Sequence, residues 1–308
     1  MMDLQQLPVF IDILRQALTS LPAEVRRVFH GRGRTYAGLE QITADWLQGQ
    51  LLITLFSEET PEFVTRLEQQ LTTLGQEMNH TILLQHRYQA GAPTQVLTGE
   101  VDTAPVVVEE GLRYQLDVGR NQNMGLFLDM RLGRRWMKAH SAGKQVLNLF
   151  AYTCGFSVAA IAGGAERVVN LDMARGALTR GRENHRLNGH NLDKVQFLGH
   201  ELFKSWGKVR KSGPYDLIII DPPSFQQGSF VLTQDYQKIL RRLPELLADQ
   251  GEVLACVNSP EVSTQFLLDE MQREAPTLTF VERLENPPEF PEEDAERSLK
   301  VLHFIHHP

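Results

Sequence analysis

The sequence predicts an α/β fold: a doubly wound, mostly parallel sheet preceded by a small α+β domain. Strand and helix patterns alternate at short spacing between residues 144 and 257, which is typical of a parallel sheet covered on both faces. Leu217–Ile220 is an unbroken apolar run, as expected for a strand at the centre of such a sheet. We expect three parts: an N-terminal helical extension (1–35), the small domain (36–118) and the larger domain (119–308).

The extension and the small domain follow from local patterns. Leu7–Leu21 has apolar residues at helical spacing, and a basic loop punctuated by glycines follows at His30–Arg34. A helix begins at Thr60, a good N-cap, and is expected to end at Gly75. Strands, the last two joined by a turn at Glu110-Gly111, are predicted at Leu39–Trp46, Gln50–Phe56, Thr81–Gln85, Val106–Glu109 and Leu112–Val118.

The larger domain is predicted from longer apolar runs. Its expected strands are Lys144–Phe150, Arg167–Leu171, Val195–Leu198, Tyr215–Ile220, Gly251–Val257 and Val301–Ile305. Its expected helices are Val158–Gly163, Arg175–Leu187 and Gln234–Leu247.

Composition excludes several classes of protein. Of 308 residues, 42% are apolar and 22% charged, which is ordinary for folded domains. No apolar run is long enough to span a bilayer and no secretion signal is evident, so we expect a cytoplasmic protein. The two cysteines, Cys154 and Cys256, exclude a disulfide scaffold or a cysteine-rich zinc site, and we expect no metal.

Ligands of a doubly wound sheet bind beyond the carboxyl ends of its strands. The loop after the first of these strands has one glycine, Gly155, where a dinucleotide site has three, which disfavours a nicotinamide cofactor. Asp172 follows the second strand, where an acid can accept both ribose hydroxyls of an adenosine or, alternatively, cap a helix.

The segment Asp221-Pro-Pro-Ser-Phe225 follows the central strand. Its prolines remove backbone donors and fix the chain direction. Carbonyl and carboxylate oxygens are then left to accept hydrogen bonds from a flat base, on which Phe225 can stack. The alternative is a plain strand-to-loop stop.

These motifs together resemble a known family. The sequence resembles class I S-adenosylmethionine-dependent methyltransferases, which are Rossmann-like, and specifically the bacterial group that methylates 23S ribosomal RNA. The resemblance covers about residues 36–308 and rests on five motifs in order: Gly125–Arg131, Val146–Phe156, Asn170–Met173, Asn184–Gly189 and Asp221–Phe225. Members of that group often carry an additional RNA-binding domain at the front, which residues 1–35 are too short to hold.

The resemblance implies S-adenosylmethionine as cofactor and RNA, specifically ribosomal RNA, as partner. It implies that Asp172 holds the ribose, that Met173 packs on the adenine, and that Glu201 accepts from the adenine amino group. Leu202 is a further expected cofactor-binding residue. Arg131 would pair with the cofactor carboxylate, or is instead a solvated charge beside Arg134 and Arg135. The remaining implied cofactor residues are Phe127, Phe150, Tyr152, Thr153, Gly155 and Asp221.

The nucleophile decides which further residues are needed. Methylation at carbon 5 of cytosine requires a covalent cysteine adduct. The cytosine-modifying branch of the family that this sequence resembles has Ser-Cys-Ser at the end of the fifth strand, where this sequence has Asn258-Ser259-Pro260. Cys154 and Cys256 are expected to be buried apolar residues. The guanine-modifying branch of the family resembles this sequence more closely around Gly125–Arg131 and at Asn258. We therefore expect a base nitrogen, with guanine favoured, and Asp221, Pro222, Phe225 and Asn258 as the residues facing the base. Alternatives are cytosine carbon 5, a substrate other than RNA, or a non-catalytic RNA-binding module.

Charge bears on the RNA partner. The formal net charge is −7, of which Glu282–Glu296 contributes −6, leaving −1 for the rest. We expect this proline-rich acidic segment to repel phosphate or to keep the chain soluble, and RNA affinity to be modest. Basic residues that could contact RNA, or be ordinary solvated helix faces, are Arg32, Arg34, Arg131, Arg134, Arg135, Lys138, Arg175, Arg180, Arg182, Arg186, Lys204, Lys208, Arg210, Lys211, Arg241 and Arg242.

Overall fold

The structure is a computed structural model that describes residues 2–226 and 230–308, with the backbone alone at Phe225 and Gln226. It divides into two compact units. Unit 1 is Met1–Leu128 together with Pro287–Asp294, and unit 2 is Asp129–Asn286 together with Ala295–Pro308. Each is described separately below.

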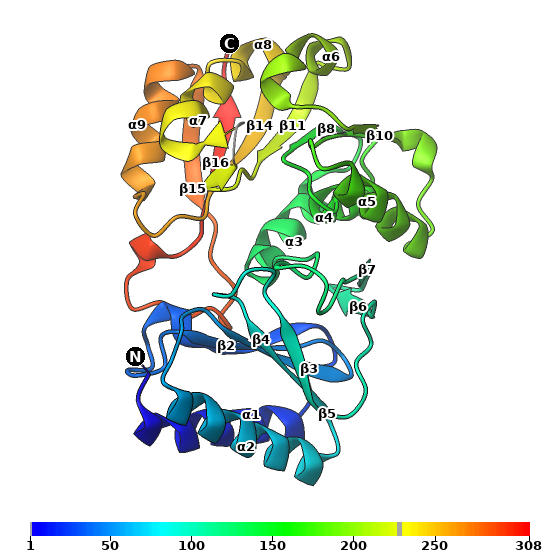
Figure 1. Cartoon of the computed structure of the whole chain (residues 1–308). Coiled ribbons are helices and arrows are strands. Elements are labelled where there is room, and N and C mark those ends of the chain that lie inside the picture. Colours follow the sequence, from blue (N-terminus) through cyan, green and yellow to red (C-terminus); the bar gives the residue numbers. More distant parts are fainter. Residues whose placement is uncertain (1, 227–229) are drawn as a thin grey trace. The chain divides into compact units, whose positions relative to one another are not determined.

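Unit 1 is built on one five-stranded sheet, in the order β1-β2-β3-β4-β5. Its strands are antiparallel except β3 and β4, which are parallel and joined by α2. Both long helices pack on one face of this sheet (Figure 1). The elements are η1 (Leu4–Gln6), α1 (Leu7–Thr19), β1 (Arg26–His30), η2 (Gly31–Gly33), β2 (Ile42–Trp46), β3 (Gln50–Leu55), α2 (Pro61–Met78), β4 (Thr81–His86), β5 (Thr94–Thr98) and the separate hairpin β6 (Val106–Glu109) and β7 (Leu112–Gln115).

Two expectations for unit 1 differ from the structure. The boundary expected at residue 35 is absent, because β1 pairs with β2 and α1 supplies Phe10 and Leu14 to the same core. The helix expected to end at Gly75 continues to Met78 and ends at Asn79 in the left-handed conformation. Gly75 serves packing, since a Cβ there would lie 2.1 Å from Thr98 Oγ1. Thr98 lies on β5, a strand that the sequence patterns did not predict.

Unit 2 contains a seven-stranded sheet in the order β10-β9-β8-β11-β14-β16-β15. The first five strands are parallel, and β16 and β15 are antiparallel additions. Helices α3, α4 and α5 pack together, while α7 and α9 form part of another layer (Figure 1). This confirms the predicted doubly wound, mostly parallel α/β fold.

The helices of unit 2 are η3 (Leu128–Met130), α3 (Arg131–His140), α4 (Gly155–Ala162), α5 (Arg175–Leu187), η4 (Leu192–Lys194), η5 (Leu202–Lys204), α6 (Trp206–Lys211), α7 (Leu232–Leu240), α8 (Leu243–Leu246), α9 (Thr264–Glu274) and η6 (Ala295–Arg297). Its strands are β8 (Gln145–Leu149), β9 (Arg167–Leu171), β10 (Val195–Leu198), β11 (Tyr215–Ile220), β12 (Phe225–Gln226), β13 (Phe230–Val231), β14 (Leu247–Val257), β15 (Leu278–Arg283) and β16 (Lys300–His306). The single helix expected at Gln234–Leu247 is two helices, because the first ends at Leu240 and Pro244 lies in the first turn of the next.

Candidate functional site

The candidate site lies at the carboxyl edge of the parallel strands in unit 2. Strands β8, β9, β10, β11 and β14 run in the same direction. Their carboxyl ends therefore meet at one edge, which is where doubly wound sheets bind ligands. Each of the loops that follow these strands supplies side chains to this edge, as described loop by loop below.

The loop after β8 has an unusual backbone. Phe150, Tyr152 and Cys154 all adopt left-handed φ angles, +58°, +47° and +63°. Each costs a residue with a side chain about 1–2 kcal/mol, so the surrounding structure must hold the loop. Backbone hydrogen bonds do so: Ala151 N–H donates to Leu171 O (3.1 Å) and Cys154 N–H to Ala151 O (2.7 Å). Helix α4 then begins at Gly155.

Helix α5 also holds this loop. The buried Asn184 donates from Nδ2 to the carbonyl of Thr153 at 3.0 Å. Gly181 allows the close approach, since a Cβ there would lie 2.4 Å from Cys154 Sγ. Asn184, the first residue of the motif Asn184–Gly189, therefore helps to hold the loop after β8 in place.

Asp172, which follows β9, uses both carboxylate oxygens within the chain. Oδ2 accepts from Tyr152 N (2.8 Å), and Oδ1 accepts from Ala174 N (2.7 Å) in the turn that leads into α5. Burial raises the pKa of this carboxyl, while the two backbone hydrogen bonds oppose that rise. Asp172 thus links the loops after β8 and β9, and each oxygen keeps a lone pair for a ligand hydroxyl.

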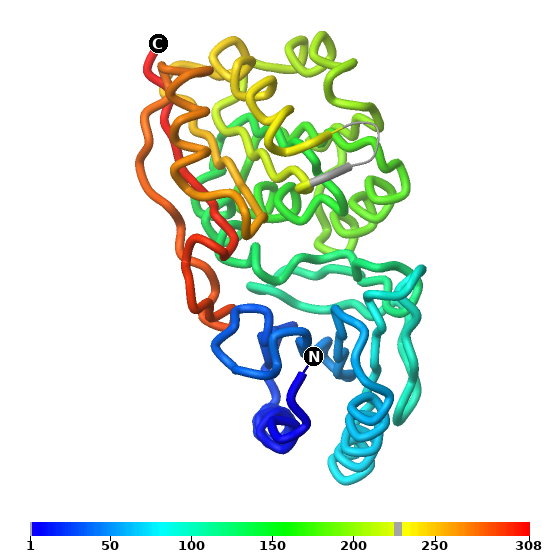
Figure 2. Tube along the Cα trace, turned by 60° about the vertical axis from the view of Figure 1, so that its left-hand side comes forward, coloured from blue at the N-terminus to red at the C-terminus, as the bar shows by residue number. Residues whose placement is uncertain are grey.

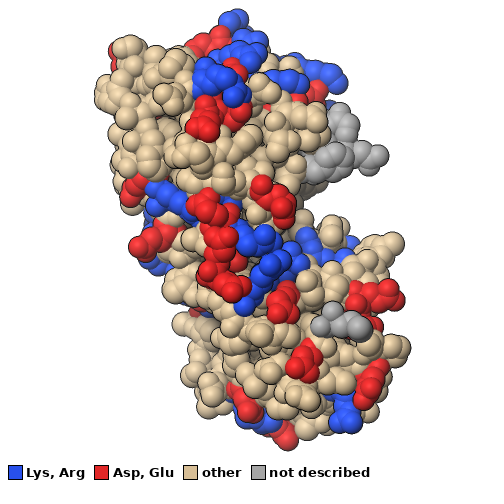
Figure 3. All heavy atoms as spheres, turned by 90° about the vertical axis from the view of Figure 1, so that its left-hand side faces the viewer, with Lys and Arg blue, Asp and Glu red and all other residues tan. Residues whose placement is uncertain are grey.

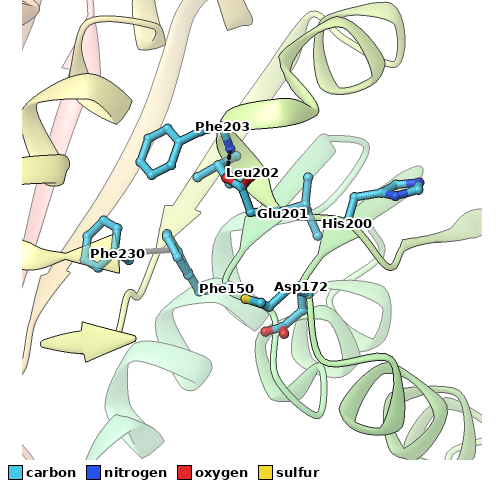
Figure 4. A pocket seen from close by; sticks show the side chains of 9 residues that line it. Phe150, Asp172, His200, Glu201, Leu202, Phe203 and Phe230 are labelled. Carbon is cyan, nitrogen blue, oxygen red and sulfur yellow. Dashed lines mark hydrogen bonds between the residues drawn. The ribbon is translucent and has the colours of Figure 1, made fainter. Parts of the chain in front are cut away.

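A pocket opens between the loops after β8, β9 and β10 (Figure 4). Phe150 and Phe230 point toward one another there, with ring centroids 5.1 Å apart. Glu201 closes another side, where Oε1 accepts from Phe203 N (2.9 Å) and Oε2 lies 3.1 Å from Lys204 Nζ. The lining residues are Phe150, Leu171, Asp172, Met173, His200, Glu201, Leu202, Phe203 and Phe230.

Asp221, at the end of β11, lies in a second cluster at this edge. Burial and the nearby Asp129 charge together raise its pKa to about 7, against the opposing charge of Arg134. Asn258, at the end of β14, donates from Nδ2 to Asp129 Oδ2 at 3.3 Å. Two carboxyl groups, a guanidinium and an amide therefore gather where β11 and β14 end.

Two hydroxyl groups join the ends of β11 and β14. The buried Tyr236 of α7 donates to Cys256 O at 3.0 Å. Ser224 donates from its hydroxyl to Asn258 O at 2.9 Å. These bonds keep Asp221 and Asn258 at fixed positions on neighbouring strands.

Arg131 and Arg134 are not solvated helix charges. They are 6% and 4% exposed, and they form the buried face of α3 with Gly133 and Met137, whereas Arg135 is exposed. The structure thus corrects the solvated alternative for Arg131. Buried guanidinium groups require polar partners, which marks this helix face as part of a polar site.

Both cysteines are buried and free. Burial raises the pKa of the Cys154 thiol and, together with the nearby Asp221 and Asp129 charges, that of Cys256. Because the thiolate is the reactive form, neither side chain has the environment of a nucleophile.

The remaining predicted site residues are less well defined. Pro222 is buried directly after Asp221, and Met173 is 44% exposed at the pocket. Phe127 is 41% exposed and belongs to unit 1. The role predicted for Phe225 rests on a side chain outside the described part of the structure.

Sequence reasoning missed Asp129, Phe203 and Phe230 as site residues, and it considered Arg134 only as a residue that could contact RNA. Asp129 lies inside the motif Gly125–Arg131, so its position in that motif was the available signal. The spacing of Arg131 and Arg134 places them on one helix face. Phe230 had no such signal, because it comes from β13, which pairs with β12 after the Asp-Pro-Pro-Ser-Phe motif.

Comparison with known proteins defines the class. The profile of the family described as S-adenosylmethionine-dependent methyltransferase matches residues 26–305. The chain therefore belongs to the S-adenosylmethionine-dependent methyltransferase family, and S-adenosylmethionine is the family's cofactor.

Among its relatives, the ribosomal RNA large subunit methyltransferase I of Aeromonas salmonicida is 37% identical over 52% of this chain and 42% of that protein. Bacillus subtilis YwbD, named as a ribosomal RNA large subunit methyltransferase, is 30% identical over 76% of this chain and 60% of that protein. This chain spans about half the length of these curated relatives.

Solved structures share the fold. A Streptococcus mutans chain described as a SAM-dependent methyltransferase superposes with a TM-score of 0.84 at 23% identity, over 97% of this chain and 81% of that chain. The tRNA m1G37 methyltransferase of M. jannaschii gives a TM-score of 0.59 at 16% identity, over 86% of this chain and 72% of that chain. Within the described residues, no helix is long and apolar enough to cross a membrane.

Proposed function

We propose that this chain transfers a methyl group from S-adenosylmethionine to a base of RNA, with large-subunit ribosomal RNA as the substrate. The proposed acceptor is a base nitrogen, with guanine favoured, and no cysteine adduct forms. The observation that carries this proposal is the Asp221 cluster at the ligand edge of a methyltransferase fold. The names of the relatives support the RNA substrate.

The pocket residues fit the cofactor chemically. Flat adenine suits the apolar surfaces of Met173, Leu202 and Phe230, and ribose hydroxyls suit the carboxylate of Asp172. Glu201 would accept from the adenine amino group through a lone pair not used by Phe203 N or Lys204. The methionine end would lie along Phe150, Tyr152, Thr153 and Gly155, with Phe127 and Arg131 as the further proposed cofactor residues.

When bound, S-adenosylmethionine supplies a methyl group whose bond to sulfur breaks in an in-line displacement, and the electron pair of that bond stays on the sulfur. The chain's task is to position the acceptor nitrogen and to remove its proton. Asp221 is suited to take that proton, because its raised pKa lies near neutral pH. Asn258 and Pro222 would border the base, with Phe225 stacked on it.

Guanine fits the paired carboxyl groups better than cytosine does. The Watson–Crick edge of guanine carries two neighbouring N–H donors, on N1 and N2, whereas that of cytosine carries one donor group. Asp221 and Asp129, which lie close enough to interact electrostatically, supply two acceptors. The buried thiols of Cys154 and Cys256 supply no nucleophile for the cytosine carbon-5 reaction.

Methyl-labelled S-adenosylmethionine and total RNA from a strain lacking this gene test the proposal. We expect label in large-subunit ribosomal RNA, and a rate reduced roughly 100-fold or more in Asp221→Asn. Label in the protein or small-molecule fraction alone would contradict an RNA substrate. Cofactor binding without transfer to any fraction would support the non-catalytic alternative.

A further inference from the structure

The acidic segment 287–294 belongs to unit 1 and is anchored there. Glu293 N–H donates to Gly33 O at 2.8 Å, and a Cβ on Gly33 would lie 1.8 Å from Pro291 O. In Figure 2 this orange-red trace runs beside the blue β1–η2 region. The segment therefore packs against the basic loop His30–Arg34 instead of standing free in solvent.

Its acids and Asp45 contact the inner residues of this loop region. Glu289 Oε1 accepts from Arg26 Nη1 at 2.9 Å, and Glu292 Oε1 lies 3.3 Å from His30 Nε2. Arg27 is held by Asp45 through two hydrogen bonds of 2.6 and 3.2 Å, and its guanidinium lies 4.7 Å from the Phe290 ring centroid. The charges of Arg26 and Arg27 are therefore used within the fold.

The two outer arginines of the same loop are left without an acid. Arg32 and Arg34 are exposed, and within the described residues neither has a carboxylate at ion-pair distance. Arg32 contacts Gln41 Oε1 at 3.3 Å. Partial desolvation by neighbouring groups lowers the pKa of the Arg32 guanidinium. The charge of Glu292 opposes this at longer range, while the like charges of Arg27 and Arg34 lower the pKa further.

The loop presents these arginines in a fixed geometry. Gly31 packs against backbone on the other side, where a Cβ would lie 1.9 Å from Leu39 O. Arg32 lies over the ring of Phe56, 4.5 Å from its centroid, and Arg87 lies over the same ring at 5.6 Å. Arg87 is oriented in turn by Asn123 Oδ1 at 2.9 Å. Two guanidinium groups thus lie over one half-buried ring, and the charge of Arg34 is close enough to act on Arg32.

The basic cluster of α7 and the residues after it differs from this one. Lys238, Arg241 and Arg242 each contact a carboxylate, Asp235, Glu274 and Glu245, at 2.7, 2.7 and 2.9 Å. On the face drawn in Figure 3, blue and red side chains are accordingly intermixed. Such paired charges gain less from an added phosphate than the unpaired charges of Arg32 and Arg34 do.

We propose that Arg32 and Arg87, which lie over Phe56, form a binding site for the RNA phosphate backbone in unit 1 together with Arg34 of the same loop. This proposal rests on the RNA substrate proposed above. Guanidinium groups match phosphate geometry and stay charged, and a preorganised loop loses little entropy on binding. Unit 1 has nine arginines and no lysine against nineteen acids, a net charge of −10. RNA therefore gains most from this unit at positive charges such as those of Arg32 and Arg34, which have no carboxylate at ion-pair distance within the described residues.

The test measures binding of a fluorescein-labelled hairpin RNA by anisotropy over a range of salt concentrations. Arg32→Gln/Arg34→Gln is compared with the control pair Arg15→Gln/Arg66→Gln, which removes the same charge from the helices of the same unit. We expect the site pair to raise the Kd roughly tenfold and to lower the salt slope by about 1.5, with little change in the control. Phe56→Leu should raise the Kd without lowering the slope, because it keeps every charge.

Unfolding temperature and S-adenosylmethionine affinity should be unchanged in both pairs, which separates RNA binding from folding. Equal effects of the two pairs would mean that total charge alone matters and would overturn the site. Methylation of RNA by wild type and the site pair at equal kcat/KM would overturn the site but leave the function standing. A wild-type chain that binds no RNA would overturn both.

Discussion

Asp221 carries a buried carboxyl group with four titratable neighbours from different elements. Asp129 from η3 raises its pKa and Arg134 from α3 lowers it, while Tyr236 of α7 and Cys256 of β14 also face it and are neutral at ordinary pH. Burial makes the largest contribution, and the resulting pKa is about 7. A base with such a pKa takes up a proton readily near neutral pH.

The first prediction concerns the pH dependence of methyl transfer. The rate should rise with pH around a midpoint near 7, because Asp221 must be ionised to accept a proton. Asp129→Asn removes a like charge and should move that midpoint to lower pH. Asp249→Asn, at an exposed position on β14, should leave it in place. An unchanged midpoint in Asp129→Asn would contradict the coupling of the two carboxyl groups.

The second prediction concerns stability. A carboxyl whose pKa rises on folding stabilises the protein at low pH, and this contribution is lost as pH rises through about 7. Asp221→Asn should therefore unfold at a temperature several degrees above that of wild type at pH 8, with a difference that shrinks as pH falls toward 4. Thermal unfolding across this pH range measures it, and a variant less stable than wild type at pH 8 would count against the buried charge.

At the scale of elements, the loop after β8 is the strained part of the site. Its left-handed residues Phe150, Tyr152 and Cys154 are held by Asp172 and by the side chain of Asn184. The position of this loop after a strand was predicted from the sequence pattern, and the cofactor role of its residues was inferred from the family resemblance. Its backbone conformation was not predictable, because the residues that hold it lie 20 or more positions further along the chain.

The third prediction tests this support. Asn184→Ala leaves the Thr153 carbonyl without its donor and should weaken S-adenosylmethionine binding roughly tenfold, equivalent to about 1.4 kcal/mol. Thr179→Ala, at an exposed position of the same helix, serves as the control. Calorimetric titration measures the S-adenosylmethionine affinity of both variants. Equal affinities of Asn184→Ala and Thr179→Ala would contradict a role of Asn184 in supporting the cofactor site.

The fourth prediction concerns the sheet of unit 2. Glu252 of β14 contacts Lys144 and lies 2.8 Å from His303 Nε2 of β16. Burial opposes its ionisation, but the contacts with His303 and Lys144 lower its pKa to about 2. Its contribution to stability is therefore present above about pH 4.5 and is lost as pH falls toward 2.

Glu252→Gln should accordingly lower the free energy of unfolding at pH 7 by roughly 1–3 kcal/mol and flatten its decline between pH 4.5 and 2. Glu245→Gln, which breaks an exposed ion pair with Arg242, should change stability by less than about 1 kcal/mol. Denaturant unfolding at several pH values measures both. A wild-type decline that persists in Glu252→Gln would assign the acid sensitivity to other groups.

Elements with strong apolar patterns were predictable, and those with polar buried faces were not. The strands β8, β9 and β11 follow apolar runs, and their predicted ranges agree with the structure. Helix α3 was not predicted because its buried face carries Arg131 and Arg134. Burial of these residues depends on polar partners elsewhere in the fold, which local patterns do not show.

At the scale of the whole molecule, the net charge of −7 conceals an uneven distribution. Unit 1 carries −10, and unit 2, with 22 basic and 19 acidic residues, carries +3. Glu282–Glu296 contributes −6 of the chain's net charge, and we expected this segment to repel phosphate or to keep the chain soluble. In the structure, Glu289 and Glu296 form ion pairs with Arg26 and Arg283, so part of that charge is neutralised within the fold.

The central claim is methyl transfer to a base nitrogen of RNA that depends on Asp221 and on no cysteine. Mass spectrometry of nucleosides tests it most directly, using ribosomal RNA treated with wild type, Asp221→Asn or Cys154→Ala/Cys256→Ala. We predict an N-methylguanosine made by wild type and by the cysteine double variant, and almost none made by Asp221→Asn. The appearance of 5-methylcytidine, or its loss in the double variant, would contradict the claim.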